Sequence, residues 1–104
     1  MRNHVHIRRF LNRRGFHAGA YVLAIVPDST TCRDPDCNHR YCTDVELRFS
    51  DCDCIVSFDF DLDSADGRRN SLYKVDVMID SLCKFRDAMA LEAERAAARG
   101  RRPH

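Results

Sequence analysis

The chain has 104 residues, of which 44% are hydrophobic and 32% charged, and its formal net charge is +1. This length suits one domain, and the ordinary apolar fraction excludes wholesale disorder. The longest apolar run, residues 18–26, is too short for a membrane-spanning helix, which needs about 20 residues. The N-terminus lacks the pattern of a secretory signal. We therefore expect a single domain over residues 1–104, without membrane contact and located in the cytoplasm.

Two strands are predicted in the first third of the chain. In residues 4–10 apolar and polar residues alternate as in a strand, although the spacing of Ile7 and Phe10 also suits one face of a helix; we favour the strand. Residues 20–26 are apolar on both faces and end at Pro27. This pattern indicates a central strand that is covered on both sides, or covered partly by a partner.

A group of metal-binding side chains follows, within residues 32–42. It consists of Cys32, Cys37, His39 and Cys42. Three thiolates and one imidazole form a complete tetrahedral set for structural Zn²⁺, with no open position for a reacting water. The alternative is a polar loop with incidental cysteines, because the spacing matches no standard zinc module. Of the remaining cysteines, Cys52 is predicted to lie in a turn, and Cys54 and Cys83 to be small buried residues.

A β-hairpin is predicted from two alternating segments, residues 44–50 and 54–63, with turn residues 50–53 between them. Pairing Phe49 with Cys54 places every apolar member on one face. A slip by one residue would bury aspartates, so the alternation specifies the face strongly.

Aspartates occupy the polar positions of this hairpin. They are Asp44, Asp59, Asp61 and Asp63. A calcium loop would need glycine and glutamate where Ser64 and Asn70 stand, so we interpret the aspartates as an acidic, solvent-facing stripe. Like charges that face each other across a hairpin repel. We therefore expect a basic group to neutralise them, either the N-terminal arginines or a partner, with preference for the arginines.

From residue 71 to residue 99 the apolar period changes to three and four, which predicts a long amphipathic helix. Asn70 or Ser71 would cap it after a turn at residues 66–67, and the basic tail, residues 99–104, is expected to fray. The predicted fold is α+β, a mostly antiparallel sheet of three to four strands with one long C-terminal helix packed on its apolar face. The helix stripe consists of Leu72, Val75, Met78, Ile79, Leu82, Phe85 and Met89.

Charge is distributed unevenly along the chain. Residues 1–27 contain five arginines and no acid, whereas residues 28–66 contain eleven acids and three arginines. A basic N-terminal segment with a zinc-stabilised loop would suit a nucleic-acid-binding protein, although no RNP, helix-turn-helix or KH signature is present. The arginines that would contact phosphates are Arg8, Arg9, Arg13 and Arg14.

Catalytic motifs such as a Gly-rich phosphate loop, G-x-S-x-G or H-E-x-x-H are absent from the sequence, so we do not expect an enzyme. Residues 68–76 and 85–88, with the strand opening at residues 50–52, resemble small accessory proteins of actinobacterial phages. The resemblance spans about residues 10–95 and implies a phage product in the host cytoplasm, without assigned activity. We predict an interaction protein that binds a host or viral protein or, as a homodimer, a second copy of itself. The contact surface would be the aspartates, the cysteine loop or the outer side of the strand at residues 20–26.

Overall fold

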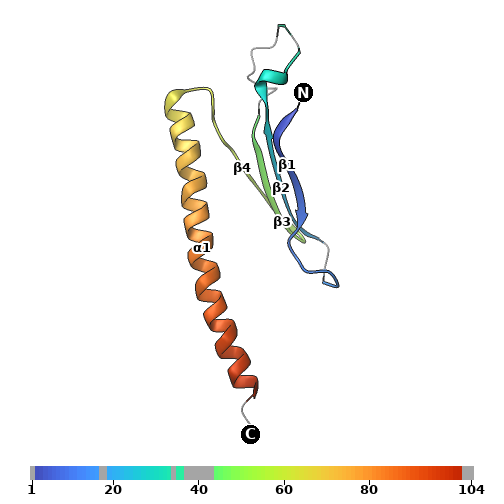
Figure 1. The fold of residues 1–104 in the computed structure, drawn as a ribbon, viewed down its shortest axis with the longest axis vertical. Helices are drawn as coiled ribbons and strands as arrows, with labels where there is room; N and C mark the ends of the chain where they lie inside the picture. Colours follow the sequence, from blue (N-terminus) through green and yellow to red (C-terminus); the bar gives the residue numbers. More distant parts are fainter. Residues whose placement is uncertain (1, 17–18, 34, 37–43, 102–104) are drawn as a thin grey trace.

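The computed structural model describes residues 2–16, 19–33, 35–36 and 44–101. Four strands are followed by one helix, with a short 3-10 helix after the second strand (Figure 1). The elements are β1 (Asn3–Phe10), β2 (Ala20–Pro27), η1 (Ser29–Thr31), β3 (Glu46–Asp51), β4 (Cys54–Phe58) and α1 (Ala65–Arg101).

The four strands form one antiparallel sheet in the order β1-β2-β3-β4. The strand interpretation of residues 4–10 is therefore confirmed, and residues 20–26 form an inner strand, as their continuous apolar character predicted. Each connection joins neighbouring antiparallel strands, by a short turn between β3 and β4 and by longer segments between the other strands. This simple meander leaves β1 and β4 as the two edges.

The β3–β4 hairpin is confirmed, but its register differs from the predicted one by two residues. Phe49 pairs with Val56 rather than with Cys54, and Asp51 pairs with Cys54. The turn therefore has only two residues, and its first residue, Cys52, has a positive φ of 59°, as tight hairpin turns require. Because side chains alternate with a period of two, this shift leaves every apolar residue on the predicted face.

One face of the sheet, the apolar face, collects most of the hydrophobic side chains. Two rings on it, Phe49 and Phe58, meet edge to face with centroids 5.8 Å apart, a favourable geometry for aromatic pairs. Two polar residues, Arg9 and Asp51, also lie on this face. The apolar residues of this face are Val5, Ile7, Ala20, Val22, Ala24, Val26, Leu47, Phe49, Cys54, Val56 and Phe58.

A connecting segment, residues 59–64, leads from β4 to α1 (Figure 1). Alternation through residue 63 predicted that these residues extend the strand, but β4 ends at Phe58. Helix side chains explain part of the difference, because they bind backbone carbonyls of this segment. Lys74 Nζ donates to the carbonyl of Asp59 at 2.8 Å, and Ser71 Oγ donates to that of Asp61 at 2.9 Å.

The helix begins at Ala65, earlier than the predicted cap at Asn70 or Ser71. Ser64 caps it, since its Oγ accepts a hydrogen bond from the backbone N–H of Gly67 at 2.9 Å. The residues predicted as a turn therefore lie in the first helical turn. A β-carbon at Gly67 would meet the carboxyl group of Asp61 and lie 2.8 Å from Ser64 Oγ, which explains a glycine within the helix. At the other end α1 continues to Arg101.

The predicted fold class, α+β with an antiparallel sheet and one long C-terminal helix, is confirmed. The helix was predicted to pack on the apolar face of the sheet. In the structure, however, the described part of α1 makes no close backbone contact with any strand. Helix and sheet stand apart in Figure 1, and α1 continues past the end of the strands. The molecule measures 72 × 31 × 22 Å. Its radius of gyration is 19.2 Å, against about 13 Å for a compact domain of this length.

Candidate interaction surfaces

The predicted acidic residues do come together. Asp44, Asp59, Asp61 and Asp63, joined by Glu46, line an open hollow of about 500 Å³ that also includes Val45 and Phe60. We call these five carboxylates the acidic cluster. They come from the start of β3 and from the connecting segment, because antiparallel pairing of β3 and β4 places these two segments side by side.

Cations neutralise the acidic cluster only in part. Glu46 forms an ion pair with Arg48 at 2.8 Å, and the Lys74 ammonium lies 5.4 Å from the centre of the Phe60 ring. Among the described residues no arginine or lysine forms an ion pair with Asp44, Asp59 or Asp61. The preferred neutralisation by N-terminal arginines is therefore not found in the described part of the chain, where β1 lies at the opposite edge of the sheet.

The predicted zinc ligands fall mostly outside the described residues. Cys37, His39 and Cys42 are not described, whereas Cys32 follows η1 as a partly exposed free thiol. Within the described ranges no group of three or more ligand-type side chains is close enough to hold a metal ion. The zinc site thus stays a prediction.

The other cysteines differ from their predicted burial. Cys52 lies in the hairpin turn, as predicted, but Cys54 and Cys83 are exposed free thiols rather than core residues. Cys54 has the predicted parity on the apolar face, and Cys83 lies on α1. Both predictions assumed that the helix covers the sheet, and this cover is missing over the length of the strands.

The four N-terminal arginines do not form a single patch. Arg8 and Arg9 point to opposite faces of β1, and the Arg8 guanidinium lies 5.6 Å from the centre of the Tyr21 ring. Arg13 and Arg14 are exposed after β1, in the turn towards β2. A nucleic-acid backbone would therefore reach only part of the predicted set from one side.

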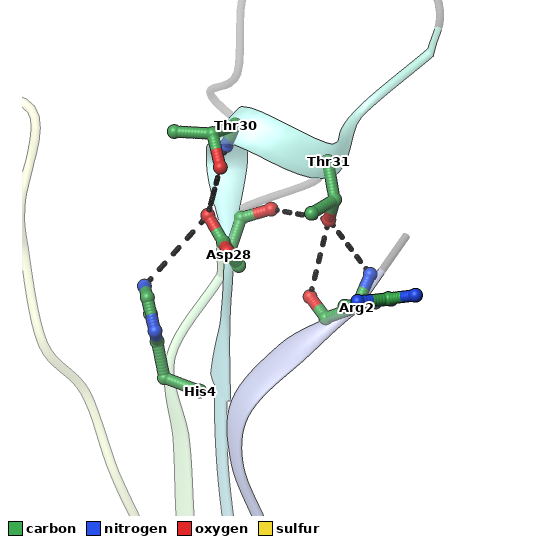
Figure 2. Close-up of polar contacts among 5 residues, drawn as sticks. All are labelled: Arg2, His4, Asp28, Thr30 and Thr31. Carbon is green, nitrogen blue, oxygen red and sulfur yellow. Dashed lines mark hydrogen bonds and ion pairs between the residues drawn. The ribbon is translucent and has the colours of Figure 1, made fainter.

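A polar cluster at the end of β2 was missed by the sequence analysis (Figure 2). The carboxylate of Asp28 accepts hydrogen bonds from Thr30 Oγ1 at 2.6 Å and from Thr30 N at 3.0 Å. Thr31 Oγ1 accepts one from Arg2 N at 2.7 Å and donates one to the carbonyl of Asp28 at 2.8 Å. The Asp-x-Thr sequence is a known signal for such a side-chain turn. The cluster joins the beginning of β1 to the end of β2.

These hydrogen bonds lower the pKa of Asp28 below its ordinary value of 3.8, with Thr30 as the main cause and His4 and Arg2 as smaller ones. A carboxyl group with a lowered pKa stabilises the fold above the ordinary value, and this contribution disappears as the pH falls through the folded value. We expect Asp28→Asn to be less stable than the native chain at neutral pH, and the difference to vanish in acid.

Urea unfolding of both chains across this pH range measures the difference. Thr30→Val, which retains the charge but removes the side-chain donor, is the matched control and should show a smaller pH-dependent difference. A gap between native chain and Asp28→Asn that is constant with pH would contradict the role given to this carboxylate.

The described histidines, His4 and His6, lie on the edge strand β1, and His4 Nε2 lies 3.8 Å from the Asp28 carboxylate. No described helix has the length and apolar content needed to cross a membrane. Comparison with protein-family models, with curated proteins and with solved structures found no match to this chain. Any functional proposal must therefore come from the surfaces themselves.

Proposed function

We propose that the chain is a small, non-catalytic interaction protein that binds a protein partner through the acidic cluster. The observation that carries the proposal is the convergence of five carboxylates around one open hollow. Three of them have no ion-pair partner among the described residues. Complementary charge steers association and selects partners, so the partner surface is expected to be basic.

The chemistry of the cluster supports a protein partner over a phosphate-rich one, because an acidic surface repels the nucleic-acid backbone. An accessory role of the kind implied by the resemblance to phage proteins fits a small charged domain that occupies a host factor. Phe60 and Val45 in the same hollow provide apolar contact area beside the charges, as protein interfaces usually do.

The double variant Asp59→Lys/Asp61→Lys is expected to abolish capture of partner proteins from a host-cell extract by the immobilised chain, while the circular dichroism spectrum stays native. Both side chains are exposed, so the substitutions do not enter a core. Asp61 Oδ1 does accept a hydrogen bond from Asp63 N at 2.8 Å, and Asp59→Lys alone, which leaves this bond in place, should weaken capture in the same direction. Reversing two charges in a complementary contact converts attraction into repulsion. Quantitative comparison of the captured proteins measures the effect.

Asp51→Lys/Asp53→Lys is the matched control, since it makes the same charge change at the opposite, turn end of the hairpin. If Asp59→Lys/Asp61→Lys still captures the partner proteins, the acidic cluster is not the binding surface. Salt-sensitive retention on heparin that is lost in Arg13→Glu/Arg14→Glu would instead favour nucleic-acid binding, where Phe10 and Phe16 beside these arginines are also exposed.

A further inference from the structure

Over most of its length the apolar stripe of α1 is not covered by any described residue of the chain. Its residues recur at intervals of three and four and so share one side of the helix. Val75 and Met78, near the N-terminal end, are half-buried. Further along, Leu82 is 58% exposed and Phe85 66% exposed. Leu72, the first residue of the stripe, is 68% exposed as well. The stripe is thus partly covered only around Val75 and Met78 and is uncovered beyond residue 78.

The connecting segment explains why the helix stands away from its own sheet. Its carbonyl groups accept hydrogen bonds from three successive turns of α1: Arg68 Nη1 donates to Leu62 at 3.0 Å, and Ser71 and Lys74 donate to Asp61 and Asp59. The segment therefore runs along the first turns of the helix on their half-buried side. Gly67, in contact with Asp61, lets it approach closely. These hydrogen bonds involve only the first turns of α1, and the rest of the helix stands apart from the sheet and continues past its end (Figure 1).

The accessible surface area of the chain indicates how much more surface it exposes than a compact monomer does. Its accessible surface is 8998 Å², whereas a compact monomer of 12.0 kDa exposes about 6,000 Å². The surplus is about 3,000 Å² per chain, or about 6,000 Å² for two chains. Permanent homodimers bury roughly 2,000–5,000 Å² in total, counted over both partners, so the surplus is more than enough for such an interface. Among the described residues only one apolar side chain, Ala20, is buried.

We propose that a second copy of this chain covers the apolar stripe of α1 and the apolar face of the sheet, so that two chains share one core. A second copy carries the same stripe and the same apolar sheet face. In a two-fold symmetric dimer these surfaces of both chains can therefore be buried against each other at once. The net charge of +1 opposes such pairing only weakly. No carboxylate of the acidic cluster belongs to the stripe or to the apolar face, so the inference goes beyond the proposed function and can fail separately from it.

Light scattering coupled to size-exclusion chromatography of the full chain, at several protein concentrations, tests this inference. The native chain is expected at twice the 12.0 kDa chain mass. Leu82→Asp places a charge in the centre of the stripe and should give the mass of one chain. Val77→Asp is the matched control: Val77 is also apolar and 45% exposed, but it lies on the other side of the helix, and its variant should remain dimeric.

Leu82→Ala keeps the test decisive if the charged variant does not fold. Each dimer would lose two buried leucine side chains, which should raise the dissociation constant on the order of a hundredfold. A native chain that is monomeric at every concentration would overturn the inference, and a radius of gyration near 13 Å would then show that α1 closes on its own sheet. A dimer that is unaffected by both Leu82 variants would also overturn it. Neither result alters the expected outcome of the capture experiment with the Asp59→Lys/Asp61→Lys variant.

Discussion

The urea midpoint of the native chain is expected to rise with protein concentration. A monomer that unfolds in two states has a midpoint independent of concentration, whereas a dimer that dissociates as it unfolds is stabilised by mass action. Each tenfold increase in concentration should add about 1.4 kcal/mol to the stability of the dimer. The expectation follows from the nearly empty core of the single chain, in which no large side chain of the described residues is fully buried.

Circular dichroism at 222 nm would follow the helix, which contributes most of the signal because α1 has 37 residues. A helix whose stripe faces water gains little from tertiary packing, which normally supplies most helical stability. Dissociation and loss of helix should therefore coincide. Val77→Asp should show the same concentration dependence as the native chain, and Leu82→Asp should show none. A midpoint that stays constant over the whole concentration range would indicate a self-sufficient monomer.

The local patterns in the sequence were sufficient for most of the fold. Strict alternation in residues 44–50 and 54–58 specified the hairpin and its apolar face, and the change of period marked the long helix. Details set by single hydrogen bonds were missed. The two-residue turn at Cys52 shifted the register, and the Ser64 cap moved the helix start by several residues, because such caps compete with equally suitable polar residues nearby.

The relation between helix and sheet could not be obtained from periodicity. An apolar stripe shows that a helix face needs cover, but it does not say which surface provides it. Cover by the chain's own sheet was the expectation, and with it burial of Cys54 and Cys83, but both cysteines are exposed. The information that separates helix from sheet lies in the connecting segment, where Ser71 and Lys74 bind backbone carbonyls.

The acidic cluster was predictable because strand pairing alone brings its members together. Asp44 and Asp59 flank paired strands, so any hairpin with this face places them near one another. The cluster around Asp28 was predictable in principle from the Asp-x-Thr signal. The zinc hypothesis depends on Cys37, His39 and Cys42, outside the described residues, and native mass spectrometry of chain purified without chelator is its direct measurement.

Replacing Ala20 with aspartate is expected to destabilise the protein strongly. Ala20 is 3% exposed at the start of β2, beside Ser50, which is equally buried and donates from Oγ to the carbonyl of Gly19 at 3.1 Å. The new carboxylate would stand beside Phe49 in a mainly apolar hollow, directly opposite Asp51 in the β2–β3 pairing. An uncompensated buried charge costs about 3–5 kcal/mol, a large part of the stability of a typical domain, which is about 5–15 kcal/mol.

Urea unfolding of Ala20→Asp and Ala88→Asp separates this effect from the general cost of an added charge. Ala88 is exposed on α1, where the same replacement should change the stability by less than about 0.5 kcal/mol. Adding Asp51→Asn to Ala20→Asp should recover part of the loss, because it removes the like charge across the strands but leaves the burial of the new carboxylate unchanged. Equal stability of the two single variants would show that the β2–β3 pairing tolerates a charge at this site, and that the fold depends on packing elsewhere.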